Sequence, residues 1–218
     1  MTQLTRRIAW GLMAFLAIGI ALAFAAPYLS FNPAVSKIPL NPAVTLHFPI
    51  LVIHAVTGGL ALLIGPFQFL DRLRMKRPMF HRLLGRVYLI CILVGGIAAL
   101  FSALNSLNGF VVQLGFTLLA VIWLYSAYRA YAAIRQRRIQ LHRLWMMRNY
   151  ALTFAAVIQR LWLVVGLVLL KLPFNEVYAS SAWASWILPL VVVEWFISQR
   201  PLQEKVSRQE KASLQAGK

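Results

Sequence analysis

Long apolar runs separated by short polar segments dominate the chain, and each run is about the length of a membrane-spanning helix. A helix needs about 20 mostly apolar residues to cross the hydrocarbon core of a bilayer. The runs therefore predict an all-α fold, a polytopic membrane helix bundle with six transmembrane helices. Their approximate positions are Ile8–Tyr28, Phe48–Leu70, Leu84–Leu104, Phe110–Ile134, Leu144–Leu170 and Trp183–Ser198.

Two connecting segments have a composition that excludes a continuous helix. Prolines recur throughout Pro27–Pro49, which predicts an external loop between the first two spans. Asn105–Gly109 is rich in turn-forming residues and predicts a tight hairpin between the third and fourth spans. We divide the chain into residues 1–47 (first span and external loop), 48–170 (a four-helix core) and 171–218 (sixth span and basic tail).

Basic residues are confined almost entirely to alternate connections between the spans. Of the 22 Lys and Arg residues, only Lys37 and Lys171 lie in the connections of one side, and only Arg160 lies within an apolar run. All the others lie near the N-terminus, in residues 71–86, in residues 129–148 or after residue 199. Because an excess of Lys and Arg marks cytoplasmic loops, we expect both termini to be cytoplasmic.

The composition supports a membrane protein and excludes some other classes. Hydrophobic residues make up 61% of the chain and charged residues 12%, whereas a soluble domain carries about 25% charged residues. The formal charge of +17 would suggest nucleic acid for a soluble protein, but here the basic residues lie between spans. We therefore expect anionic inner-leaflet lipids as partners, and no nucleic acid. The single Cys91 lies in an apolar run, so no disulfide or metal site is expected.

The first span has a second interpretation. Arg6 and Arg7, the following apolar run and the small residues around Ala23–Ala25 resemble a cleavable signal peptide. The apolar run is longer than a usual signal core, and Pro27 closely follows the candidate cleavage site. We favour a retained transmembrane helix.

One basic residue is predicted to lie deep in the membrane. Arg160 is about 15 Å from the outer end of its span, where a lone arginine costs at least about 2.5–3.5 kcal/mol. Glu194 in the sixth span has a similar predicted depth, so we expect a buried Arg160–Glu194 ion pair. The alternatives are a site for an anion or a cofactor propionate, and a side chain that extends to the interface.

Three histidines are candidates for cofactor binding. His81 and His142 are predicted at the cytoplasmic boundary of the third and fifth spans, where two imidazoles can ligate a b-type haem from both faces. Arginines near them could hold the propionates: Arg82, Arg86, Arg143 and Arg148. The alternative is a basic interfacial collar that contacts lipid phosphates. His54, in the outer half of the second span, is a candidate haem ligand, proton carrier or structurally satisfied histidine.

Several short motifs together resemble a known family. They are His54 with Gly58-Gly59, Gly65-Pro66-Phe67-Gln68-Phe69, His81-Arg82 with Gly85-Arg86 and Tyr88, Gly95-Gly96, and His142-Arg143 with Trp145-Met146, Arg148, Tyr150–Thr153 and Arg160. This series resembles the bacterial predicted-membrane-protein family known as domain of unknown function 2306, over roughly residues 48–170. The resemblance implies a multi-pass protein of the bacterial cytoplasmic membrane and implies no activity. A looser similarity, in helices and histidines only, is to membrane cytochromes b and ferric reductases.

Three function classes remain open from the sequence. The first is a redox-linked membrane protein that holds haem or quinone between its helices. The second is a small transporter or proton-coupled carrier that uses His54 and Arg160. The third is a non-catalytic assembly or sensor protein. The chain contains no phosphate-binding glycine loop and no metalloprotease helix, so no enzyme activity is assigned.

Overall fold

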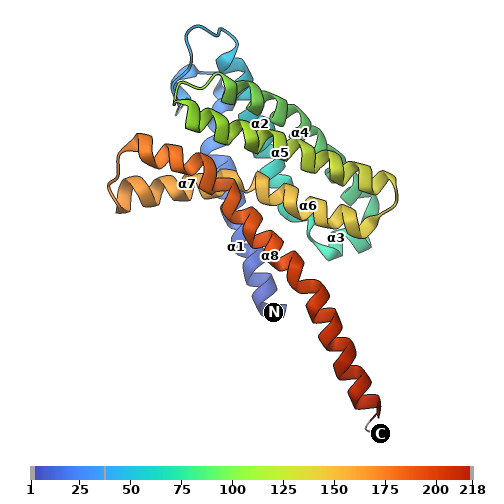
Figure 1. Ribbon diagram of the computed structural model, residues 1–218. Helices are drawn as coiled ribbons and strands as arrows, with labels where there is room; N and C mark the ends of the chain where they lie inside the picture. Colours follow the sequence, from blue (N-terminus) through green and yellow to red (C-terminus); the bar gives the residue numbers. More distant parts are fainter. Residues whose placement is uncertain (1–2, 37, 217–218) are drawn as a thin grey trace.

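The computed structural model describes the backbone of residues 3–36 and 38–216, and the side chains of residues 3–5, 7–36 and 38–199. This part of the chain is helical and has no strand (Figure 1). The principal helices are α1 (Gln3–Ile20), α2 (His47–Gln68), α3 (Asp71–Lys76), α4 (Pro78–Leu104), α5 (Phe110–Arg135), α6 (Ile139–Thr153), α7 (Ala155–Val164) and α8 (Phe174–Ala216). Short π and 3₁₀ segments are η1 (Ala21–Ala25), η2 (Ala26–Ser30), η3 (Pro33–Val35) and η4 (Val165–Leu169).

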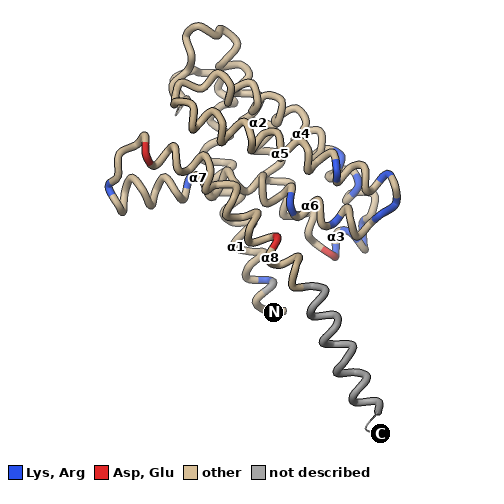
Figure 2. The backbone as a smooth tube through the Cα atoms, in the orientation of Figure 1, with Lys and Arg blue, Asp and Glu red and all other residues tan. Residues whose placement is uncertain are grey.

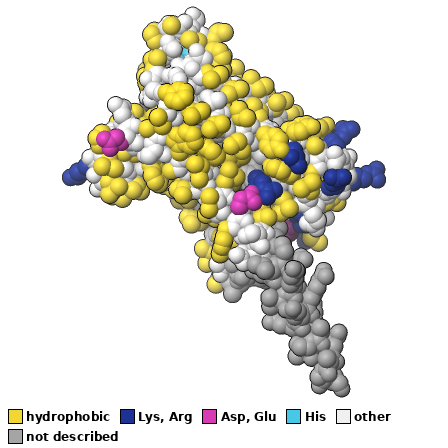
Figure 3. Space-filling view, viewed as in Figure 1, with side chains coloured by type: hydrophobic (Ala, Val, Ile, Leu, Met, Phe, Trp, Pro, Cys, Tyr) yellow, Lys and Arg dark blue, Asp and Glu magenta, His cyan; other side chains and the backbone are white. Residues whose placement is uncertain are grey.

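Six helical segments are long and apolar enough to cross a membrane. They are Gln3–Ser30, His47–Gln68, Pro78–Leu104, Phe110–Arg135, Ile139–Leu169 and Phe174–Gln199. Large apolar side chains also cover much of the described surface (Figure 3). A water-soluble monomer rarely exposes so extensive an apolar surface, whereas a lipid environment favours it. The predicted all-α bundle with six spans is confirmed.

The centre of the molecule is a four-helix bundle made of α2, α4, α5 and α6. α4 packs on α2 and α5, and α6 packs on α5 and more lightly on α2, so α4 and α6 lie on opposite sides of the bundle. α1 packs along α2, where the Trp10 indole donates a hydrogen bond to the Pro66 carbonyl (2.9 Å). α7 and α8 form a hairpin on the other flank (Figure 1).

Charged side chains distinguish the two ends of the bundle. Lys and Arg gather around α3 and the α5–α6 connection, which we call the basic end (Figure 2). The opposite end, which we call the far end, carries the α4–α5 hairpin, the α7–α8 connection and the loop before α2. The predicted turn at Asn105–Gly109 forms this hairpin, and Gly109 has a positive φ of 88° that a glycine adopts at no steric cost.

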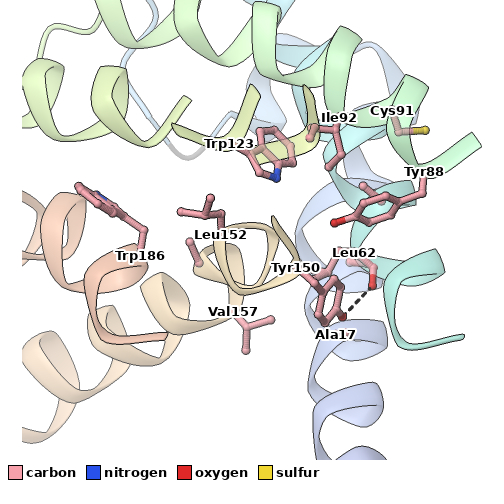
Figure 4. Close-up of a cluster of buried hydrophobic side chains, with 14 residues drawn as sticks. Ala17, Leu62, Tyr88, Cys91, Ile92, Trp123, Tyr150, Leu152, Val157 and Trp186 are labelled. Atoms are coloured by element: carbon pink, nitrogen blue, oxygen red, sulfur yellow. Dashed lines mark hydrogen bonds between the residues drawn. The ribbon is translucent and has the colours of Figure 1, made fainter. Parts of the chain in front are cut away.

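Aromatic side chains fill the core where the helices meet. Figure 4 shows Tyr88, Trp123 and Tyr150 among smaller buried side chains such as Ala17 and Leu62. The Tyr150 hydroxyl donates a hydrogen bond to the Leu62 carbonyl (3.2 Å), which joins α6 to α2. The small residues allow the backbones to approach closely, as in other membrane bundles.

Two predicted spans differ from the structure. The fifth was expected to be continuous over Leu144–Leu170, but the helix is interrupted at Phe154, between α6 and α7. The Thr153 hydroxyl donates to the Asn149 carbonyl (3.0 Å), a back-bond that often bends helices. The sixth begins at Phe174 and not at Trp183, so most of the expected connection between the fifth and sixth spans is the start of α8.

Candidate functional site

A closed network of polar side chains crosses the middle of the bundle. The Tyr88 hydroxyl on α4 donates to Asn149 Oδ1 on α6 (2.7 Å) and lies 2.9 Å from the Thr153 hydroxyl oxygen. The Trp123 indole on α5 donates to the same Thr153 oxygen (2.9 Å). Asn149 Nδ2 donates to the Trp123 carbonyl (3.0 Å) and to the Ser126 hydroxyl (2.8 Å).

This network has a structural role. All five residues are buried, and the side-chain polar atoms of Tyr88, Asn149, Thr153 and Trp123 have hydrogen-bond partners within it. A fully satisfied polar network in a low-dielectric interior holds its helices in one register. We conclude that it fixes α4, α5 and α6 relative to one another.

His54 lies in the far half of the bundle, on α2. Its Nδ1 donates to the Gly95 carbonyl on α4 (3.0 Å), because a carbonyl can only accept. In the neutral imidazole this leaves Nε2 as the acceptor nitrogen. The Trp123 ring of α5 lies edge-on to His54, with 6.4 Å between ring centroids. Trp123 is thus the aromatic neighbour of His54 in this part of the bundle.

Arg160 lies on α7 in the same half of the protein. Its Nη1 donates to the Ala156 carbonyl (3.2 Å) and to Gln159 Oε1 (2.7 Å), and the guanidinium lies over the Phe24 ring at 5.2 Å. Ala156 is one turn closer to the membrane centre, so the side chain points inward and does not extend to the far surface. Arg160 is close enough to His54 for their charges to interact.

The predicted ion pair between Arg160 and Glu194 is wrong. Glu194 instead forms a bidentate pair with Arg148, in which Nη2 and Oε2 are 2.9 Å apart. Because α8 begins at Phe174, Glu194 lies about 30 Å from the far end at 1.5 Å per residue, which is near the basic end. Its carboxylate meets α6 there, where Arg148 also lies close to the Trp145 ring (4.9 Å).

His81 and His142 lie together at the basic end. They are on α4 and α6, on opposite sides of the four-helix bundle, and close enough for their charges to interact. His142 Nδ1 donates to the Ala130 carbonyl on α5 (2.8 Å), which leaves Nε2 as the acceptor. His81 Nδ1 is buried and has no hydrogen-bond partner.

Other buried donors at the basic end also lack partners. They are Gln68 Nε2, near the end of α2, and Arg143 Nε and Trp145 Nε1, both in the first half of α6. Gln68 lies beside α4, because a Cβ on Gly85 would be 3.3 Å from its Oε1. A buried donor without an acceptor costs about 1–3 kcal/mol, so a cluster of them favours a bound group that supplies acceptors.

The other arginines predicted at the basic end are less well placed to bind a cofactor. Arg86 is exposed, and Arg148 is already paired with Glu194. Of the arginines expected around a cofactor, Arg143 has the buried and unpartnered nitrogen. The structure therefore brings His81, His142 and Arg143 to one end of the bundle and leaves His54 and Arg160 in the other half.

The described residues have two further features. No group of three or more His, Cys, Asp or Glu side chains among them has a metal-binding arrangement. A cleft of about 300 Å³ lies at the far end between α7, η4 and α8. Its lining is apolar apart from Glu176 and Ser180, and it contains none of the predicted site residues.

Several residues important in the structure were not singled out as site residues from the sequence. Tyr88 and Gln68 appeared only within the family-like motifs, and Tyr28 only as the end of the first predicted span. The signal for Tyr88 was its place seven residues after His81, the same spacing as from His142 to Asn149. Seven residues return to nearly the same helix face, so the two residues of each pair share one face.

Comparisons with known proteins give one match. A family model described as "Predicted membrane protein (DUF2306)" matches residues 51–197. The match covers α2 to α7 and most of the membrane-spanning part of α8, and therefore extends beyond the region in which the motifs were noted. No curated protein and no solved structure matches the chain.

Proposed function

We propose that this chain, which belongs to the DUF2306 family of predicted membrane proteins, binds one b-type haem at the basic end and takes part in electron transfer. One observation carries the proposal. His81 and His142 approach the same end from opposite sides of the bundle, and the Nδ1 of His81 is buried without a partner. We further propose that the protein resides in a bacterial cytoplasmic membrane with the basic end inside.

The residues of the basic end fit a haem in chemical type. A ligating histidine usually donates its other ring N–H to a carbonyl or carboxylate, and His142 already donates Nδ1 to Ala130. The unpartnered nitrogens of Arg143 and Gln68 would donate to the propionates. Gly85 follows His81 by about one turn, and the Gln68 side chain lies against that face of α4.

The ligand set indicates the kind of chemistry. A haem held by His81 and His142 would supply a one-electron redox couple. The positive charges of the surrounding arginines would stabilise the propionates and hold the group at the membrane edge. His54 is not paired with a second histidine in this way, and its aromatic neighbour is Trp123.

An absorption spectrum of protein purified from haem-replete cells tests the proposal. We expect an intense Soret band at a stoichiometry of about one haem per chain. His81→Ala and His142→Ala should each abolish the low-spin spectrum, because each removes one axial ligand. His54→Ala is the matched control and should retain it. A flat visible spectrum of the folded wild-type protein, or equal loss in all three variants, would contradict the proposal.

A second candidate function is favoured by the surface of the basic end. Arg129 lies 4.7 Å from the centre of the Trp145 ring, so a cation and an aromatic side chain meet beside α5 and α6. Such sites suit the phosphates of anionic lipids. In this interpretation the unpartnered donors bind lipid and the visible spectrum is flat.

A further inference from the structure

We infer that the far half of the protein holds a second site, in which Arg160 binds an oxyanion. The oxyanion is a carboxylate or a phosphate. Tyr28 and Tyr178 complete the site. Its evidence is separate from that for the haem, because no residue of the basic end contributes to it. The inference therefore stands or falls independently of the proposed function.

The first observation is that Arg160 has no counter-charge among the residues that the structure describes. Among the described residues it forms no ion pair, and both hydrogen-bond acceptors of its Nη1 are neutral, the Ala156 carbonyl and the Gln159 amide oxygen. Glu194, the acid expected to neutralise it, is bound to Arg148. The Nε and Nη2 groups of Arg160 have no hydrogen-bond partner in the described structure, yet they are not sealed from contact with solvent-sized molecules.

The second observation is the kind of groups around the guanidinium. Tyr28 from η2 and Tyr178 from α8 are both buried and lie close enough to Arg160 to interact electrostatically. Neither hydroxyl has a hydrogen-bond partner among the described residues, and neither is fully enclosed. His54 of α2 is also within electrostatic range. The guanidinium and the two tyrosine hydroxyls thus bring donors from α7, η2 and α8 to one place.

The chemistry of these groups selects the ligand. An unpaired guanidinium in a low-dielectric region is costly, and a bound anion offsets that cost. Arginine's planar N–H groups match two oxygens of a carboxylate or phosphate, and tyrosine hydroxyls are neutral donors that can complete the coordination. The Phe24 ring, on which the guanidinium lies, supports the cation but cannot neutralise it.

Such an oxyanion has two sources. A fatty acid or an acidic phospholipid would enter from the bilayer, whereas a small carboxylate or inorganic phosphate would enter from water at the far end. Arg160 is about 15 Å from the end of its span, at Leu170, a depth that either route can reach. The shared chemistry is the oxyanion, and the experiment distinguishes the routes.

Thermal unfolding of the full chain in a neutral detergent provides the test. One arm adds sodium phosphate or acetate, with chloride at the same ionic strength as the reference. The other arm adds oleate or phosphatidic acid at a fixed ratio to detergent. A ligand that binds the folded state at a hundredfold excess over its Kd should raise Tm by about 5–10 °C. The arm that shows the shift identifies the source.

Variants assign the shift to Arg160. Arg160→Leu should abolish it and raise the ligand-free Tm, because the variant removes an uncompensated charge. Arg160→Lys keeps the charge but loses the planar fork, so the apparent affinity should fall about tenfold. Lys171→Leu is the matched control, an exposed basic residue at the same end, and should respond like the wild type.

Three outcomes would overturn the inference. They are the absence of any shift in both arms, an undiminished shift in Arg160→Leu, and a ligand-free Tm of Arg160→Leu well below that of the wild type. The last would show that Arg160 is a structural residue whose two hydrogen bonds stabilise the fold.

Discussion

At the scale of single residues, buried polar groups divide into those that have partners and those that lack them. Tyr88, Asn149 and Thr153 satisfy one another across the bundle. Arg160 and His81 retain donors or a ring nitrogen without a partner. Membrane interiors penalise unsatisfied polar groups strongly. We therefore assign the first set to stability and propose that the second set binds ligands.

Tyr88→Phe tests the structural role of the central network. The change removes one hydroxyl that bonds to both Asn149 and Thr153, and leaves Asn149 Oδ1 without its donor. We expect a loss of about 1–2 kcal/mol in the free energy of unfolding, measured by denaturant titration in detergent micelles. Tyr128→Phe, at an exposed tyrosine, should have no effect. Equal stability of both variants would show that the network contributes nothing.

The sequence located the buried charge but not its surroundings. The depth of Arg160 follows from its distance along an apolar run, because helix rise is constant. The partner of Glu194 does not follow from the sequence pattern, since it depends on where α8 begins and on which helix faces meet. A start at Phe174 moves Glu194 toward the basic end and makes Arg148 its neighbour.

At the scale of helices, contact with glycines decides how closely the elements pack. Gly65 of α2 lies against the ring of Tyr150 on α6, and an added Cβ would overlap that ring. Tyr150 cannot move away easily, because its hydroxyl is bonded to Leu62 and its ring packs on Phe69 and Phe154. The α2–α6 contact thus requires glycine at this position.

Gly65→Ala should therefore destabilise the protein by about 1–3 kcal/mol, the usual cost of overpacking. Gly19→Ala is the matched control, because nothing lies within 4 Å of a Cβ at Gly19 in α1. Alanine has the higher helix propensity, so this control should be neutral or stabilising by up to about 1 kcal/mol. Thermal unfolding of the two variants in the same detergent distinguishes them. A similar loss in both would contradict the proposed packing constraint.

The break between α6 and α7 shows what the helix pattern could not predict. No proline or glycine lies close to Phe154 in the sequence. The usual helix-breaking signals are therefore absent there. The bend coincides with side-chain bonds from Asn149 and Thr153 to other helices and to the local backbone. The bond from Asn149 to Ser126 exists only after α5 and α6 have packed, which is why a local pattern does not reveal it.

At the scale of the whole molecule, the number of spans was predictable because apolar run lengths reflect bilayer thickness. The arrangement of the four-helix core was not, since it depends on pairwise contacts such as those of Gly65 and Tyr88. The two candidate sites lie at different depths of this bundle. The His81–His142 region is at the basic end, and Arg160 is in the far half.

Cysteine labelling tests the orientation of these sites across the membrane. In a Cys91→Ala background, Lys171→Cys and Arg138→Cys each place one thiol at an exposed position on opposite ends of the bundle. The excess of Lys and Arg at the basic end predicts that this end faces the cytoplasm. A membrane-impermeant maleimide should label Lys171→Cys in intact cells and Arg138→Cys only after permeabilisation. Labelling of both from one side would contradict the six-span topology, and the reversed pattern would contradict the orientation.

The expected pattern would place His81 and His142 within reach of cytoplasmic electron donors and open Arg160 toward the outer leaflet, so that one bundle presents a different chemistry to each side.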